Sequence, residues 1–171
     1  MRVGFSYAKG IMGFFSRIIM FFSGAKASHA WMLYFDHDFC MDMVMDAHET
    51  GIRVIPFSKF LQKNNIVEIY TPRLSIDAGL KSAAQWVGTP YDYQGLLGML
   101  WVEIGHWFKR KWKNPLATTK MVFCSKWCVL TMQAAKYPGT TNMDPDDTDP
   151  WTLRWVFHGD GSLLWDWKAN Q

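Results

Sequence analysis

Residues 121–130 read Met-Val-Phe-Cys-Ser-Lys-Trp-Cys-Val-Leu, an apolar approach followed by a sequence typical of a buried helix beginning at Cys124. The first N–H groups of a helix have no partner within it, and the helix macrodipole is positive at that end. Both features favour the thiolate form of a cysteine placed there. Cys124 is therefore a candidate nucleophile. The alternative is a packed core thiol, because free cysteine is among the most buried residue types.

A nucleophilic cysteine needs a base to take its proton. Residues 28–35, Ser-His-Ala-Trp-Met-Leu-Tyr-Phe, place His29 at the start of a predicted strand. His29 is therefore the candidate base.

The imidazole of such a pair is held by a third polar group. Residues 43–48 and 52–56 have the pattern of a β-hairpin. Alternate residues of a strand share a face, so Asp46 and His48 point the same way and either one can orient the His29 ring. The alternative is that both are polar residues facing water near the turn.

The composition indicates one globular domain. The chain has 171 residues, of which 16% are aromatic, far too many for a disordered segment. The net charge of +3 is too small to indicate specific nucleic-acid binding. Three cysteines, an odd number, argue against a disulfide framework and suit a reducing compartment.

A metal site is a weaker alternative. Six candidate ligands include soft ones, but they form none of the compact pairs that mark structural zinc: His29, His37, Cys40, His48, Cys124 and Cys128. No phosphate-binding glycine loop is present either. We therefore expect neither a metal nor a cofactor.

Periodicity and turn residues predict an α+β fold, a small antiparallel, barrel-like sheet with flanking helices. Strands are expected over residues 3–7, 29–35, 43–48, 52–56 and 66–71, and helices over 13–22, 58–63, 75–87, 93–111 and 124–136. Residues 1–171 form a single domain in this interpretation. Residues 139–171 are expected to be a Pro- and Asp-rich linker and a Trp-rich tail, packed on the domain or appended to it.

The apolar stretch over residues 11–22 is interrupted by Arg17 and follows no charged leader, so it does not resemble a secretory signal. It is also too short to span a bilayer. We expect a buried helix, with a membrane-surface helix as the alternative. The expected location is the cytoplasm, or the host cytoplasm for a phage-encoded protein.

The densest basic patch consists of Lys109, Arg110, Lys111 and Lys113. Its simplest interpretation is a solvated helix end, because cations are favourable near a helix C-terminus. The alternative is a contact with an anionic membrane or polymer surface.

Four segments, taken in their order along the chain, carry a resemblance to a known family. They are a helix leading into a Ser-His strand (16–19 and 27–31), an acidic-Ala, Gly-Val hairpin (44–47 and 51–57), a Tyr-Asp-aromatic step (90–93) and a Phe-Cys-Ser step (123–125). They resemble the circularly permuted NlpC/P60 group of papain-like cysteine enzymes, the YiiX-like and lecithin:retinol acyltransferase-like proteins.

The resemblance implies a permuted papain-like fold with Cys124 as nucleophile, His29 as base and Asp46 as third member. The family more often has Glu at the third position, so His48 is a substitute for Asp46. Lys126 stands where an acidic residue commonly follows Cys-Ser, and the tail after Pro138 has no counterpart.

The expected function is that of a thiol hydrolase or acyltransferase acting on an amide or ester. The resemblance implies a peptide, cell-wall or lipid substrate, with peptidoglycan-type peptides slightly ahead of lipids. The alternative is a non-catalytic module on the same fold, which would hold a glycan, lipid or protein at a membrane or cell-wall surface.

Overall fold

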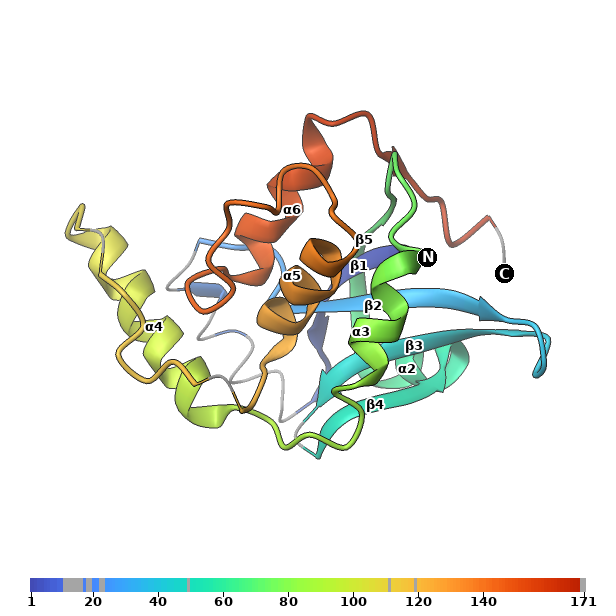
Figure 1. The fold of residues 1–171 in the computed structure, drawn as a ribbon, viewed down its shortest axis with the longest axis horizontal. Helices are drawn as coiled ribbons and strands as arrows, with labels where there is room; N and C mark the ends of the chain where they lie inside the picture. The colour runs from blue at the N-terminus through green and yellow to red at the C-terminus, as the bar shows by residue number, and fades with distance from the viewer. Residues whose placement is uncertain are drawn as a thin grey trace.

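The computed structural model describes residues 1–10, 17, 20, 21, 24–48, 50–110, 112–118 and 120–169. It confirms an α+β fold in which helices flank one antiparallel sheet (Figure 1). The helix predicted over residues 13–22 falls largely outside the described residues.

The sheet contains six strands in the order β4-β3-β2-β1-β5-β6. The strands are β1 (Arg2–Ala8), β2 (His29–Asp36), β3 (Met41–His48), β4 (Gly51–Pro56), β5 (Asn64–Thr71) and β6 (Leu163–Leu164). All five pairings are antiparallel. In the described part of the chain β4 and β6 form the two edges, so the sheet is open rather than closed into a barrel.

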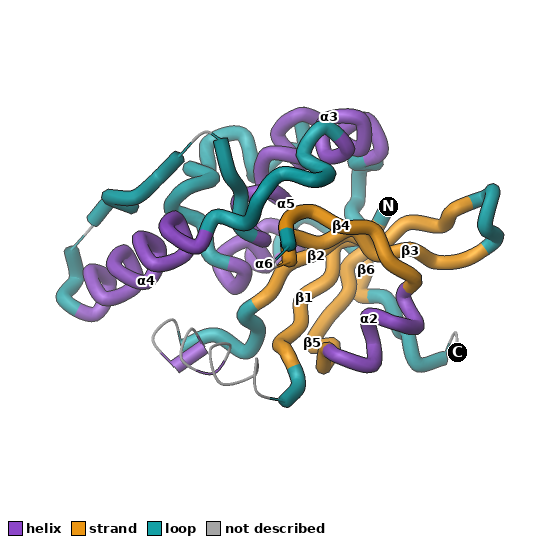
Figure 2. The backbone as a smooth tube through the Cα atoms, turned by 90° about the horizontal axis from the view of Figure 1, so that it is seen from below, coloured by secondary structure: helices purple, strands orange, loops and turns teal. Residues whose placement is uncertain are grey.

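Helices cover both faces of the sheet (Figure 2). They are α2 (Phe57–Lys63), a 3-10 turn η1 (Asp77–Gly79), α3 (Leu80–Ala84), α4 (Tyr93–Trp107), α5 (Cys124–Ala134) and α6 (Pro150–His158). α2 lies on one face, while α5 and α6 pack on the other. Among the described residues, no helix combines the length and the apolar character needed to cross a bilayer.

Alternation along the strands sends side chains into two hydrophobic clusters. In β2, Ala30 and Met32 join the cluster formed with α5, whereas Trp31 and Leu33 pack in the second cluster with Phe60 of α2. Successive strand residues point to opposite faces, so a strand that is buried on both faces is apolar throughout. The two layers place the start of β2 close to the start of α5.

Two predicted helices are shorter in the structure. The segment expected to be helical over residues 75–87 forms only η1 and α3. The helix expected over residues 93–111 ends at Trp107, because Lys109 adopts a left-handed conformation with φ of 54°. Lys111 lies outside the described residues.

The C-terminal segment forms part of the core. α6 was not predicted from the sequence. Its first turn is capped by Asp149, whose Oδ1 accepts hydrogen bonds from the N–H groups of Trp151 (2.7 Å) and Thr152 (3.1 Å). Leu153 and Phe157 of α6 are buried in the α5 cluster.

The acidic segment before α6 is anchored rather than free. Lys126, which is only 3% exposed, donates to Asp146 Oδ1 (2.6 Å) and to the carbonyl of Thr118. Asn114 donates its backbone N–H to Asp147 Oδ1 (2.8 Å). A buried ammonium requires such partners, so these bonds fix the segment onto α5.

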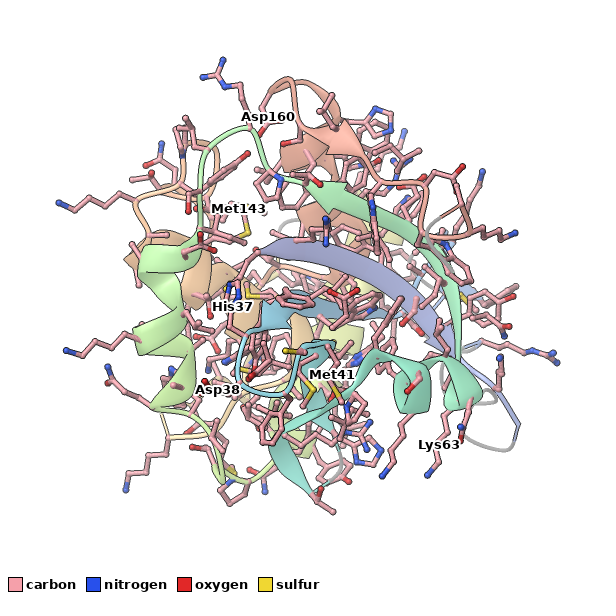
Figure 3. The ribbon with its side chains drawn as sticks, turned by 90° about the vertical axis from the view of Figure 1, so that its right-hand side faces the viewer. His37, Asp38, Met41, Lys63, Met143 and Asp160 are labelled. Carbon is pink, nitrogen blue, oxygen red and sulfur yellow. The ribbon has the colours of Figure 1, made fainter. Side chains whose placement is uncertain are left out.

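The residues after α6 return to the sheet. β6 pairs with β5, and the N–H of Trp165 donates to the carbonyl of Ile69 (2.8 Å). Asp160, which is labelled in Figure 3, lies in the turn that follows α6. Its carboxylate accepts a hydrogen bond from the Tyr137 hydroxyl.

The burial of α6 predicts a large effect on stability. Leu153→Ala should lower the free energy of unfolding by about 3 kcal/mol, since a fully buried leucine loses its packing and leaves a cavity. Trp155→Ala on the exposed face of the same helix should cost less than about 1 kcal/mol. Urea denaturation of both variants measures the difference. Equal small effects would show that α6 is not part of the cooperative unit.

Candidate active site

Cys124 is the first residue of α5. The preceding Phe123 occupies the N-cap position with extended backbone angles, and no side chain caps the helix. Phenylalanine cannot accept the hydrogen bonds that Ser, Thr, Asp or Asn accept at this position. The first N–H groups of α5 are therefore left for another acceptor, and the Cys124 sulfur lies beside them.

The Cys124 thiol lies against the start of β2. Its Sγ donates to the carbonyl oxygen of Ser28 over 3.9 Å, and it shares a hydrogen bond with the side chain of His29. The Cys124 residue is only 3% exposed. Cysteine and histidine, 95 positions apart in the sequence, are therefore direct neighbours.

His29 is the first residue of β2, and its ring is held from two sides. Nε2 lies 3.1 Å from Asp46 Oδ2. The ring stacks on Phe60 of α2 with a centroid distance of 6.2 Å. The His29 side chain is 18% exposed, whereas that of Asp46 is 1% exposed. The carboxylate thus orients the imidazole from the interior.

Asp46 is also bound by Arg53, a residue that the sequence analysis did not select. Arg53 Nε donates to Asp46 Oδ1 (2.8 Å) and Nη2 donates to Oδ2 (3.2 Å). The two residues face each other directly in the β3–β4 pairing. Both carboxylate oxygens of Asp46 are therefore satisfied, by Arg53 and by His29.

The electrostatics of the pair favour charge separation. Burial raises the pKa of the Cys124 thiol, but the hydrogen bond and charge of His29 and the N–H groups of Ala30 and Ser125 outweigh it and lower the pKa. Burial lowers the pKa of His29, but Asp46 and Cys124 outweigh that effect and raise it to about 10. The pair is therefore shifted toward thiolate and imidazolium.

The other buried groups behave differently. Burial raises the pKa of Asp46, yet its hydrogen bonds with His29 and Arg53 bring the pKa below its usual value, so the carboxylate stays ionised. Burial and the charges of Cys124 and Asp46 raise the pKa of Cys128 well above its usual value. Since Cys128 is also fully buried, we expect it to be an unreactive core thiol.

Tyr91 is a further titratable residue whose backbone lies beside the segment that leads to Cys124. Its backbone forms a bridge to Val122, just before the nucleophile step. Burial and the charge of Cys124 raise the pKa of Tyr91 well above its usual value. This tyrosine therefore keeps its proton and can only donate or accept as a neutral group.

The structure brings together Cys124, His29 and Asp46 of the candidate residues. His48 is two residues after Asp46, at the C-terminal end of β3, and pairs with Gly51. Asp46 is the residue whose carboxylate meets the His29 ring. Arg53 was missed, because the predicted hairpin had its turn at residues 49–51, whereas in the structure β4 already begins at Gly51 and Arg53 faces Asp46. Within the described residues, no three His, Cys, Asp or Glu side chains gather as a metal ion would require.

Neither a protein-family model, nor a curated protein, nor a solved structure matches this chain. Function is therefore inferred from the geometry of the site.

The pKa directions predict selective alkylation. At neutral pH, brief iodoacetamide treatment should label Cys124 ahead of Cys40, which is exposed but does not lie in this site, and should leave Cys128 unlabelled. Peptide mass spectrometry locates the label. His29→Ala should slow labelling of Cys124 by about tenfold or more, because the thiolate loses its counterion. Faster labelling of Cys128 would contradict the assignment.

The charge on His29 depends on Asp46. In the wild type this charge stabilises the fold fully below about pH 6.5, and the stabilisation is lost as pH rises through about 10. Asp46→Asn should shift the His29 titration, followed by NMR of the imidazole, to lower pH and slow Cys124 alkylation. Arg53→Gln leaves the carboxylate beside the imidazole, so it should have a smaller effect on both measurements than Asp46→Asn.

His48→Asn serves as the matched control and should change neither the titration nor the alkylation rate. If His48→Asn had the larger effect, His48 rather than Asp46 would be the group that holds the imidazole.

Proposed function

We propose that this protein is a thiol-dependent hydrolase or acyltransferase that acts on an amide or ester bond. The single observation that carries the proposal is the continuous chain of contacts from the Cys124 thiol at the start of α5, through His29, to the buried carboxylate of Asp46. A nucleophile, a base and an anionic anchor in this order constitute the arrangement of a cysteine hydrolase.

In the proposed mechanism each of the three groups has one role. His29 Nε2 is turned to Asp46, which leaves Nδ1 to take the Cys124 proton. The thiolate would attack the substrate carbonyl carbon, and the carbon–leaving group bond would break as His29 returns the proton to the leaving group. Water or another acceptor, deprotonated by His29, would then release the acyl group from Cys124.

The start of α5 supplies stabilisation for the oxyanion. Its first N–H groups are not capped by a side chain, and the helix macrodipole is positive there. N–H donors fixed before the reaction are worth about 3 kcal/mol of transition-state stabilisation in known acyl-transfer sites. The uncapped Phe123–Cys124 step, unfavourable for the helix alone, is consistent with this role.

The resemblance to the permuted NlpC/P60 group supports the same proposal. The chain order, with the histidine strand before the cysteine helix, is the order of that group, and a helix N-terminus against an antiparallel sheet is compatible with a permuted papain-like arrangement. Substrates of that group include both cell-wall peptides and lipids, so both classes belong in a substrate screen.

A second candidate function is a binding module without turnover. The observation that favours it is the 3% exposure of Cys124, which restricts access of a substrate carbonyl to the sulfur. The enzyme would form a covalent acyl intermediate on Cys124, whereas the binding module would not.

An activated ester tests the enzymatic proposal directly. After incubation with p-nitrophenyl acetate, intact-mass measurement should show one added acetyl group that maps to Cys124 and disappears with time. Cys124→Ala should abolish it, and His29→Ala should slow its formation at least tenfold. Cys128→Ala is the matched control and should acylate normally. Absence of acylation at Cys124, or equal acylation at Cys40, would favour the binding module.

A further inference from the structure

α4 is apolar on the side that packs against the protein and also on the side that faces solvent. Met99 and Val102 are buried against Phe123. Leu97 and Trp101 are 63% and 49% exposed and stand one helical turn apart, with Tyr93 (52%) one turn earlier. A helix with apolar side chains on opposite sides is normally covered by other groups on both sides. In Figure 1, α4 extends away from the sheet at one end of the molecule.

The basic segment that follows α4 is folded back beside this apolar face. The left-handed Lys109 lets the N–H of Arg110 donate to the carbonyl of Gly105 (2.9 Å). Trp112 then stacks on Trp101 with a centroid distance of 4.5 Å. The chain thus reverses direction at the helix end instead of continuing into solvent.

Two glycines of α4 make this close return possible. A Cβ at Gly105 would lie 2.9 Å from the Trp112 ring, and one at Gly98 would lie 1.8 Å from Asn114 Oδ1. Asn114 is in turn held by a hydrogen bond from its Nδ2 to the carbonyl of Gly95 (2.8 Å). The segment from Trp112 to Asn114 is therefore locked along one side of α4.

The result is a mixed surface, here called the α4 surface. It consists of exposed apolar side chains next to exposed cations: Leu97, Trp101, Phe108, Lys109, Arg110 and Lys113. The nearby carboxylate of Asp146 is paired with Lys126, and that of Asp147 accepts the N–H of Asn114. The cations are therefore not neutralised by these neighbours.

We propose that the α4 surface docks on an anionic lipid bilayer. Apolar and aromatic side chains enter the interface between headgroups and acyl chains, while Lys and Arg beside them are attracted to anionic headgroups. The cations favour this occupant, because a purely apolar protein partner would offer no counterions to Lys109, Arg110 and Lys113, whereas anionic headgroups would. This role goes beyond the proposed acyl chemistry and does not require Cys124.

Vesicle sedimentation tests the proposal with the full chain. The wild type and Cys124→Ala should both sediment with vesicles of phosphatidylcholine and phosphatidylserine at low salt. Raising the salt should release most of the protein, because screening weakens the attraction. Arg110→Gln with Lys113→Gln should weaken binding about tenfold or more. Lys59→Gln with Lys63→Gln, on exposed positions of α2, is the control pair and should bind normally.

A second pair of variants tests the apolar component. Leu97→Gln with Phe108→Gln (63% and 67% exposed) should weaken binding about tenfold or more. The matched control is Leu163→Gln with Phe39→Gln (71% and 66% exposed). Phe39 lies in the β2–β3 turn, which His37, Asp38 and Met41 mark in Figure 3, at the opposite end of the molecule from α4.

Failure to sediment with anionic vesicles, or equal losses in the control and test pairs, would overturn the proposal. So would a concentration-dependent dimer, seen by sedimentation velocity, that only the α4 variants dissociate while vesicle binding stays unchanged. In that case the α4 surface would be a contact between copies. None of these outcomes affects acylation of Cys124, so failure here is distinguishable from failure of the proposed acyl chemistry.

Discussion

The buried carboxylate of Asp46 is the constraint on which the site depends. Desolvating an ion costs several kcal/mol, and removing one partner of a buried pair typically costs ~3–5 kcal/mol because the other charge remains unpaired. Asp46 is 1% exposed and receives Arg53 on one side and His29 on the other. Arg53 keeps the carboxylate charged, and the carboxylate in turn keeps the imidazole charged. The β2–β3–β4 register fixes these groups, and it leaves the second ring nitrogen of His29 for Cys124.

The parts that the sequence predicted depend on short-range patterns. Alternation and turn residues were sufficient for the hairpin of β3 and β4 and for the strand that begins at His29, because strand faces follow a period of two. The apolar approach and helical spacing after Phe123 were sufficient for the start of α5 at Cys124. The expectation that His29 contacts Cys124 came from the order of the motifs in the resembled family, because local sequence patterns say nothing about residues so far apart in the chain.

The missed features each depend on contacts between distant segments. The segment that forms α6 was predicted to be a linker and tail, because Pro145, Pro150 and several aspartates suggest irregular structure. In the structure Pro150 is the first residue of α6 and Asp149 is its N-cap, and both residue types are favourable at these positions. Lys126 departs from the pattern of the resembled family. Its ion pair with Asp146, 20 residues away, depends on the fold and could not be inferred from the local sequence. Arg53 depends on the register of the hairpin. The predicted turn at residues 49–51 is one residue longer than the observed one, in which His48 pairs with Gly51, and this difference decides which β4 residue faces Asp46.

The nucleophile and the α4 surface share one structural support. Val122 forms a backbone bridge with Tyr91, and the Val122 carbonyl accepts a hydrogen bond from the N–H of Asp92 (3.1 Å). The Asp92 side chain accepts a hydrogen bond from the N–H of Gly95 in the first turn of α4. Phe123, the next residue, packs against the buried side of α4 and immediately precedes Cys124. Val122 and Phe123 therefore contact the start of α4 and lead directly into the start of α5. Packed interiors transmit displacement because they contain few voids. A force that tilts α4 therefore acts on Phe123, and through it on the N–H groups that face the Cys124 sulfur.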